Sequence, residues 1–443
     1  MKTVQSMPRH GWRALRHLAL LAGLASAALP AGADEAARQL AADLLDRLDG
    51  GDYPAAVALM TPQLATALPA ERLRSVWESL PAVYGARRQR GTPVDENYRS
   101  GHKVRVPMTY ERAALNAEIA IDGQRRIAGL LIVPQTAPTA LEQNANFSET
   151  PLAIPLAGAS LPATLTRPAA AGRVPGVVLV HGSGPHDRDE SIGPNKPFRD
   201  LAHGLARRGV AVLRYEKRSR ARPEDFAGDF GIDDETTDDA VAALRVLAGQ
   251  PGIGPVFVLG HSQGGMLAPR IAERAAVPAG AILWAAPARP VLDSVIEQFE
   301  RIAAQDGAVD AGERRAIDAL AGGLAAIRRG EDPPRADAPL QLPAGYWRSL
   351  DAVRAVDDAQ RSKTPLLILH GGRDYQVTDA DWAIWQQTFA DSPRVVLKRY
   401  PALNHLGIAG EAPSTPLEYQ RPGRVDKALI DDVAAWIKAR AGS

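Results

Sequence analysis

A serine lies in a glycine-rich turn between two contrasting stretches of the chain. Residues 255–259 are an apolar, partly β-branched run typical of a buried strand, and residues 266–275 are compatible with a helix. Residues 260–264 between them read Gly-His-Ser-Gln-Gly, the spacing G-x-S-x-G, whose small neighbours let a tight strand-to-helix turn close around a nucleophile. We predict that the turn presents the Ser262 hydroxyl for attack. The Gln263 backbone N–H, at a helix start, would face developing negative charge.

A serine nucleophile needs a base, and the base needs an orienting group. The apolar run 366–369 leads into a Gly-rich turn and Asp374, and the run 394–400 leads into a loop with His405. We predict His405 as the base toward Ser262 and as the acid toward the leaving group. Asp374 would orient its imidazole. Two nearby carboxylates, Asp379 and Asp381, stay open as alternatives to Asp374.

A second backbone donor is expected at another strand end. The apolar run 177–180 ends at His181-Gly182-Ser183-Gly184, so the backbone N–H of Ser183 is the natural partner of the Gln263 N–H in an oxyanion hole. We expect His181 to pack and hydrogen-bond within this loop. His261, inside the serine turn, is also given a structural role.

From residue 150 onward strands and helices alternate. A leading antiparallel pair is predicted at 151–156 and 161–167, and the repeated strand–helix units that follow predict a mostly parallel sheet with helices on both faces. The reactive residues then fall at the carboxyl ends of the strands, where such sheets bind ligands. The catalytic domain is predicted to span residues 150–443.

One insertion, about residues 287–363, breaks this alternation. It holds two amphipathic helices, predicted at 291–304 and 311–328, and its position on the catalytic edge predicts a helical cap. Tyr346 and Trp347 are candidates for lining an acyl or alcohol pocket. Packing within the cap remains the alternative for both.

The first 33 residues resemble a secretory signal peptide. Basic residues precede a short apolar stretch, and Ala31-Gly32-Ala33 offers a cleavage site after Ala33. We therefore expect an exported protein, either periplasmic or secreted into the medium. An uncleaved anchor remains the alternative. No later stretch predicts a membrane span.

Residues 34–133 predict a small α+β domain, and residues 134–149 a linker. Helices are expected at 35–48, 54–60 and 69–80, followed by strands at 102–110, 114–121 and 126–133. Helices followed by an antiparallel meander resemble the NTF2-like fold. No convergent set of His, Asp or Glu marks this domain as catalytic.

Composition narrows the function further. Lys and Arg number 52 against 51 Asp and Glu, so the net charge of +1 gives no reason to expect a nucleic-acid partner. The chain has no cysteine, which excludes disulfides, thiolate metal sites and a cysteine nucleophile. We expect neither a metal nor a cofactor. The oligomeric state is not predicted.

The catalytic part resembles the α/β-hydrolase superfamily, and within it the bacterial EstD-like carboxylesterases. The resemblance is carried by residues 181–190, 193–198, 214–218, 260–265, 372–377, 403–406 and 413–419. It implies the α/β-hydrolase fold and an esterase triad of Ser262, Asp374 and His405. One departure is Gly407-Ile408, where the resemblance leads us to expect a bulkier aromatic residue.

The sequence therefore predicts a serine carboxylester hydrolase that acts on small esters with short- to medium-chain acyl groups. A serine peptidase is the nearest alternative, and would need a carboxylate or a deep pocket to bind a peptide terminus. Glu216 could supply the carboxylate, unless Lys217 and Arg218 pair with it. An acyl thioesterase and a non-catalytic binding protein are weaker alternatives.

Overall fold

The structure is a computed structural model that describes residues 35–98, 101–135, 140–169, 172–226, 228–304, 307–334, 338–411 and 413–442. It divides into two compact units, the first ending at residue 137 and the second beginning at residue 138, with Pro333–Leu342 grouped with the first. The predicted signal peptide lies outside the described residues.

The first unit is built from helices followed by an antiparallel sheet. Its helices are α1 (Glu35–Asp49), α2 (Tyr53–Ala58), α3 (Pro62–Ala67) and α4 (Ala70–Tyr84). Its strands are β1 (Arg87–Arg90), β2 (Val94–Tyr98), β3 (Gly101–Tyr110), β4 (Ala114–Ile121) and β5 (Ile127–Pro134). They run in the order β1-β3-β4-β5, with β2 also paired to β3. The NTF2-like assignment stays a prediction.

Alternation of apolar and polar side chains explains how this sheet packs. Along β4, Leu115, Ala117, Ile119 and Ile121 are buried while the residues between them are not. Strand side chains alternate between faces, so one face of the sheet joins a single apolar core with Leu44 and the other buried residues of the helices.

The second unit contains an eight-stranded sheet in the order β13-β12-β11-β10-β8-β9-β7-β6. The strands are β6 (Phe147–Leu156), β7 (Ala159–Pro168), β8 (Val174–Val180), β9 (Ala211–Tyr215), β10 (Ile253–His261), β11 (Gly280–Trp284), β12 (Leu366–Gly371) and β13 (Val395–Tyr400). Neighbouring strands from β9 across to β13 are parallel, and only β7 and β6 join antiparallel. The predicted mostly parallel sheet with a leading antiparallel pair is confirmed.

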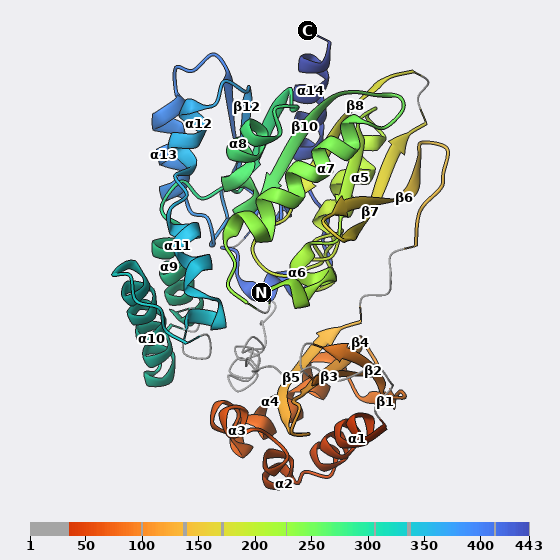
Figure 1. Ribbon diagram of the computed structural model, residues 1–443, viewed down its shortest axis with the longest axis vertical. Helices are drawn as coiled ribbons and strands as arrows, with labels where there is room; N and C mark the ends of the chain where they lie inside the picture. The colour runs from red at the N-terminus through yellow and green to blue at the C-terminus, as the bar shows by residue number, and fades with distance from the viewer. Residues whose placement is uncertain are drawn as a thin grey trace, which may run out of the picture. The chain divides into compact units, whose positions relative to one another are not determined.

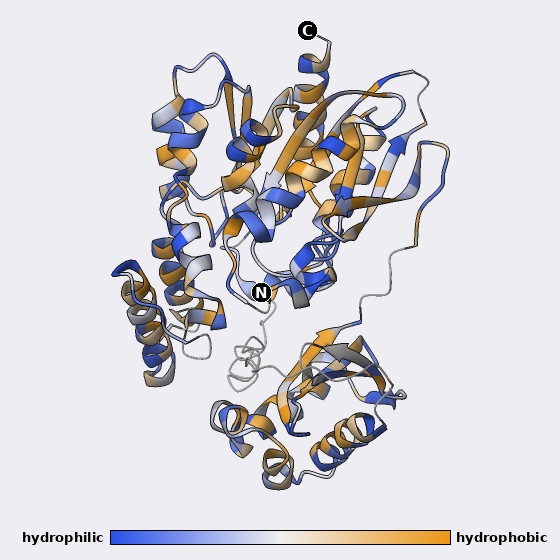
Figure 2. Ribbon diagram, viewed as in Figure 1, coloured by the Kyte–Doolittle hydropathy of each residue, from blue (hydrophilic) through white to orange (hydrophobic). Residues whose placement is uncertain are grey.

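Helices cover both faces of this sheet (Figure 1). On one face, α5 (Pro197–Ala206) and α14 (Lys427–Ala441) share a core with the β8 residues Val177 and Leu179. On the other face lie α7 (Asp238–Ala248) and α8 (Gln263–Ala275). The central strands are coloured as strongly hydrophobic in Figure 2. Strands covered on both faces need such continuous apolar runs.

The insertion between β11 and β12 is helical. It contains α9 (Val291–Ala303), α10 (Ala311–Arg328), α11 (Ala344–Asp351) and α12 (Ala355–Arg361), and the first three pack against one another. An Asp310–Glu313 capping box starts α10. The remaining helices are α6 (Arg218–Ala221) and α13 (Asp379–Phe389). In the portion of the chain that is described, no helix combines the length and apolar character needed to cross a membrane.

Candidate active site

Ser262 occupies the turn between β10 and α8. Its backbone has φ 53° and ψ −118°, a conformation in the left-handed half of φ that is strained for a residue with a side chain. The turn closes only because its neighbours are glycines. A Cβ on Gly260 would lie 2.0 Å from the Gly264 carbonyl oxygen, and one on Gly264 would lie 2.3 Å from that of Val180. The G-x-S-x-G spacing thus reflects direct backbone contact.

The structure brings His405 and Asp374 together at the ends of β13 and β12. His405 Nδ1 donates a 2.6 Å hydrogen bond to Asp374 Oδ2, and both side chains are buried. Asp374 Oδ1 accepts the backbone N–H groups of Gln376 and Val377 at 2.8 and 3.0 Å. These bonds fix the carboxylate. A proton held on Nδ1 leaves Nε2 of the neutral imidazole as the nitrogen that can accept a proton.

The two alternative carboxylates have other partners. Asp379 pairs with Arg399 at 2.9 Å. Asp381 pairs with the Arg289 guanidinium at 2.8 Å and also accepts the Arg289 backbone N–H. Asp374 is therefore the carboxylate that holds the His405 ring.

His261 joins the serine turn to the histidine loop. His261 Nε2 lies 2.9 Å from the His405 carbonyl oxygen, and the two imidazole rings are 4.6 Å apart. His405 is thereby held against the residue that precedes Ser262. The other nitrogen of His261, Nδ1, forms a 2.9 Å ion pair with Glu190. Oxygen atoms face both ring nitrogens, an environment that favours the protonated form of His261.

The pKa shifts of this pair agree with that environment. Burial alone would raise the pKa of Glu190, but the charge and hydrogen bonding of His261, with smaller contributions from His186 and His181, together lower that pKa to about 2. Burial alone would lower the pKa of His261, but the charge and hydrogen bonding of Glu190, with smaller contributions from the His405 carbonyl and Asp374, together raise it. Glu190 also accepts the Gly182 N–H at 2.7 Å. One buried pair thus ties the loop after β8 to the serine turn.

The two backbone N–H groups predicted to form an oxyanion hole belong to residues near the serine turn, and their role stays a prediction. Gln263 is the first residue of α8, and the first N–H groups of a helix have no partner within it. Ser183 follows Gly182, and a Cβ on Gly182 would lie 3.2 Å from Cβ of Ser262. The loop after β8 therefore lies directly beside the serine turn. Ser183 itself is exposed.

His181 has the structural role expected for it. It is fully buried, and its Nε2 bonds the Asp187 carbonyl oxygen at 3.0 Å. Burial lowers its pKa to about 3, with smaller contributions from neighbouring charges. His181 is therefore neutral at ordinary pH.

Tyr346 and Trp347 are both buried on α11. The Tyr346 hydroxyl donates to Gln263 Oε1 at 3.1 Å, which brings the insertion to the start of the nucleophile helix. Trp347 packs edge-on against Tyr346, with ring centroids 5.6 Å apart. Their assignment as pocket residues stays a prediction.

The backbone at Gly407 explains why this position carries no bulky aromatic residue, the departure from the resemblance noted in the sequence. It adopts φ 68°, and a Cβ there would lie 2.9 Å from the Trp284 ring. A bulky aromatic at this position would need both another backbone conformation and a displaced Trp284. The preceding Asn404 side chain accepts the Leu406 and Ile408 N–H groups at 3.0 Å each, which fixes the loop that carries His405.

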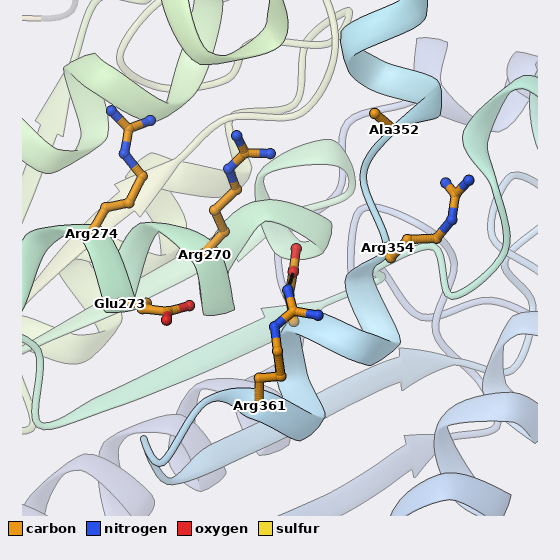
Figure 3. A pocket seen from close by; sticks show the side chains of 7 residues that line it. Arg270, Glu273, Arg274, Ala352, Arg354 and Arg361 are labelled. Atoms are coloured by element: carbon orange, nitrogen blue, oxygen red, sulfur yellow. Dashed lines mark hydrogen bonds and ion pairs between the residues drawn. The ribbon is translucent and has the colours of Figure 1, made fainter.

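A cavity of about 480 Å³ lies elsewhere, toward the far end of α8 (Figure 3). Its lining residues are mainly charged: Arg270, Glu273, Arg274, Ala352, Arg354, Asp358 and Arg361. Arg270 is eight residues beyond Ser262, about 12 Å along the helix. Arg270 and Arg274 form 2.6 Å ion pairs with Asp233 and Asp238. Because its guanidinium groups are paired and remote from the serine, this cavity is not the candidate active site.

The sequence analysis missed the roles of three buried residues around the site, and the ion pairing that it considered for Glu216 differs from the one observed. Glu190, Lys217 and Glu235 carry the contacts that hold the loops, yet the sequence patterns assign them no role. Glu216 pairs with Arg188 at 2.7 Å and with Arg220, and not with Lys217 or Arg218 as considered above. The motif stretches 181–190 and 214–218 contain Glu190 and Lys217, and were the available signal for them. No group of His, Asp or Glu suited to a metal occurs among the described residues.

Comparison with known proteins decides the family. Residues 177–417 match the model of the alpha/beta hydrolase family. The chain belongs to this family. It is also 33% identical over 399 residues to Esterase EstD of Thermotoga maritima, across 89% of this chain and 93% of that protein.

Solved structures of other hydrolases show more distant similarity. Est1E from Butyrivibrio proteoclasticus is 17% identical with a TM-score of 0.44, covering 66% of this chain and 99% of its own. Brefeldin A esterase, a bacterial homologue of human hormone sensitive lipase, is 19% identical with a TM-score of 0.41, covering 70% and 80%.

Proposed function

We propose that this α/β-hydrolase is a serine carboxylester hydrolase. The observation that carries the proposal is the 2.6 Å hydrogen bond between His405 and Asp374, made beside a serine held at φ 53° in a strand-to-helix turn. A nucleophile, a base and an orienting carboxylate that follow three parallel strands of one sheet are the machinery of acyl transfer. The esterase name of the 33% identical relative supports the same chemistry.

The acylation step follows from the geometry. Ser262 Oγ attacks the ester carbonyl carbon while His405 Nε2 takes the hydroxyl proton. Asp374 stabilises the imidazolium that forms. The N–H groups of Ser183 and Gln263 bind the oxyanion of the tetrahedral intermediate. The intermediate then expels the alcohol, which takes its proton from His405, and the acyl group remains on Ser262.

Hydrolysis of the acyl-enzyme uses the same groups in reverse order. His405 takes a proton from water, and the resulting oxygen nucleophile attacks the acyl carbon. The second tetrahedral intermediate collapses, Ser262 recovers its proton from His405, and the carboxylic acid leaves. The sequence of steps balances without a metal or a cofactor.

We propose small esters with short- to medium-chain acyl groups as the substrates. Glu216 was the carboxylate considered as a peptide anchor for the peptidase alternative, and it is held by Arg188 and Arg220 instead. A carboxylate with two cationic partners makes a poor site for a further cation. The ester assignment is therefore favoured over a peptide substrate.

The test is initial rates on p-nitrophenyl acetate, butyrate, octanoate and palmitate, with wild type and Ser262→Ala side by side. We expect hydrolysis of the shorter esters, and a loss of at least about 10⁴-fold with Ser262→Ala. Ser183→Ala is the matched control, because it keeps the backbone N–H, and it should stay within about threefold. Aminoacyl anilides hydrolysed faster than every ester would overturn the proposal in favour of a peptidase.

We further propose that the protein is exported, and that the chain is cleaved after Ala33. The basic start, the apolar stretch and the Ala-x-Ala site support this. The full chain expressed in a Gram-negative host should give a soluble periplasmic protein. Its intact mass should match a chain that begins at Asp34. An uncleaved mass in the membrane fraction would contradict cleavage and favour an anchor.

A further inference from the structure

Four buried polar side chains form a connected chain behind the two oxyanion donors. They are Lys217, Glu235, Gln263 and Tyr346, each no more than 5% exposed. They come from four different segments: the loop after β9, the turn before α7, the start of α8 and the insertion helix α11. None of them is part of the triad.

Lys217 holds the peptide that supplies one donor. Its Nζ donates to the Gly182 carbonyl oxygen at 2.7 Å. That carbonyl and the Ser183 N–H belong to the same peptide group, and in a trans peptide they point in opposite directions. With Lys217 on one side, the Ser183 N–H is turned to the other side. The Gly182 N–H, in the preceding peptide, is held by Glu190 at 2.7 Å.

Glu235 connects this peptide to the second donor. One carboxylate oxygen, Oε1, pairs with Lys217 Nζ at 2.8 Å and accepts the Ser219 hydroxyl at 3.0 Å. The other, Oε2, accepts the Gln263 side-chain amide at 3.2 Å and the Thr236 hydroxyl at 2.5 Å. A single buried carboxylate therefore links Lys217, which orients Ser183, to the side chain of Gln263.

The backbone around Glu235 is also unusual. Asp233–Thr237 form a π-helical turn ahead of α7, a rare geometry that is frequent at functional sites. Glu235, Thr236 and Thr237 are all buried on this turn. The Gln263 side-chain amide is bonded at both ends: its nitrogen donates to Glu235, and its oxygen accepts the Tyr346 hydroxyl at 3.1 Å. The first residue of α8 is thereby held from two directions.

We propose that Lys217 and Glu235 are positioning residues that hold the two oxyanion N–H groups at a fixed separation, with Tyr346 completing the restraint on Gln263. This inference rests on the proposed function. Lys217 Nζ contacts Gly182 and Glu235, so it acts through the peptide and not on the substrate. A buried ion pair gives little net stability, because the cost of desolvation offsets the attraction. This favours a role for the Lys217–Glu235 pair in orienting the Gly182–Ser183 peptide over a role in stability.

The consequence is selective for the transition state. An oxyanion forms only after Ser262 attacks. Poorly oriented donors should therefore raise the free energy of the transition state more than the free energy of the substrate complex. We expect Lys217→Met to lower kcat about 100-fold on p-nitrophenyl butyrate, with KM within about threefold. Inhibition by a boronic acid, which forms a tetrahedral adduct on the serine, should weaken by a similar factor.

Arg220→Met is the matched control. Arg220 is three residues further on, and its exposed guanidinium pairs with Glu216 at 3.7 Å. It should change kcat by less than about threefold. Each variant is compared with wild type by near-ultraviolet circular dichroism, so that loss of folding is seen separately from loss of rate.

Tyr346→Phe keeps the inference testable if Lys217→Met does not fold. It removes a single hydroxyl and should lower kcat about three- to tenfold at constant KM. A folded Lys217→Met with kcat within threefold of wild type would overturn the inference. If Lys217→Met does not fold, an unchanged kcat in Tyr346→Phe would overturn it. Failure of the proposed function is distinct, because it would appear as an inactive wild type that does not react with the boronic acid.

Discussion

The two units of the molecule bury different kinds of side chain. Among the described residues between 35 and 135, in the first unit, the buried residues are mostly apolar; the exceptions are Thr61 and the side chain of Asp95, which pairs with His102 at 3.0 Å. The second unit buries many more charged groups. Those around the site lie at or after the ends of its parallel strands or in the turn before α7: His181, Glu190, Lys217, Glu235, His261, Asp374 and His405. Arg214 and Glu149 form a further buried pair within the sheet. Burying charge costs free energy unless each group is paired.

Apolar cores and buried charged groups therefore occupy different parts of the molecule. The core of the first unit is an apolar cluster, with Leu44, Leu45 and Ile119 fully buried. In the second unit the same kind of core lies between the sheet and its helices, and a layer of charged groups is added where the strands end. Perturbed pKa values in that layer are the expected mark of a functional site. The predictions below test this division.

The largest effect is expected from the orienting carboxylate. Asp374→Asn keeps the shape of the side chain but favours the wrong tautomer of His405, so kcat should fall about 10⁴-fold. Asp379→Asn, five residues on and paired with Arg399, should leave kcat within about threefold. Steady-state rates on p-nitrophenyl butyrate check both. A reversed order would make Asp379 the acid of the triad.

Stability at acid pH should depend on His181. Its pKa is about 3 in the folded protein and about 6.5 when unfolded, so only the unfolded chain gains a proton between those values. The contribution of His181 to stability is therefore full above about pH 6.5 and is lost as pH decreases toward 3, by about 4–5 kcal/mol in all. Glu190, with a pKa of about 2, adds a loss below about pH 4.5.

Urea unfolding of the second unit at several pH values measures this dependence. His181→Asn should flatten the slope between pH 6.5 and 4.5, since its amide does not titrate there. An unchanged slope in that variant would contradict the assignment of a buried neutral histidine.

A core substitution in the first unit should affect stability alone. Leu44→Ala removes a fully buried side chain and should destabilise that unit by about 3 kcal/mol. The rate of ester hydrolysis should be unchanged, because the triad lies wholly in the second unit. Calorimetry resolves the affected transition, and rates are measured below its midpoint. A tenfold drop in kcat would show that the first unit contributes to the site.

The smallest effect is expected in the insertion, away from the charged layer. Gly322 lies inside α10, and no atom lies within 4 Å of the position that an alanine methyl group would take, so Gly322→Ala should stabilise the protein by about 0.5–1 kcal/mol. Gly158→Ala is the contrasting control. Gly158 has equal space but a φ of 73°, so alanine there should destabilise. Equal shifts in both melting temperatures would contradict this account.

Much of the second unit could be predicted because its signals are local. Buried parallel strands are continuous apolar runs, and the turn at Ser262 needs small residues at two fixed positions. The Asp374 and His405 side chains follow strands whose order brings them to one edge. Their hydrogen bond follows from a topology that the alternation of strands and helices predicts.

The missed features depend on contacts distant in the sequence. Glu235 meets Lys217 and Gln263 only after three segments have packed together, and nothing local distinguishes it from the neighbouring acids. Strand β1 reads Arg-Arg-Gln-Arg and has no apolar alternation to mark it as a strand. Its pairing with β3 overrides that composition.

The most direct test of the central claim is to locate the covalent adduct of a fluorophosphonate. The wild-type protein is treated with the reagent, digested, and sequenced by mass spectrometry. We predict one adduct per chain, on Ser262, that forms much more slowly in Asp374→Asn. A folded protein that gives no adduct, or an adduct on another residue, would contradict the assignment of Ser262 as the nucleophile.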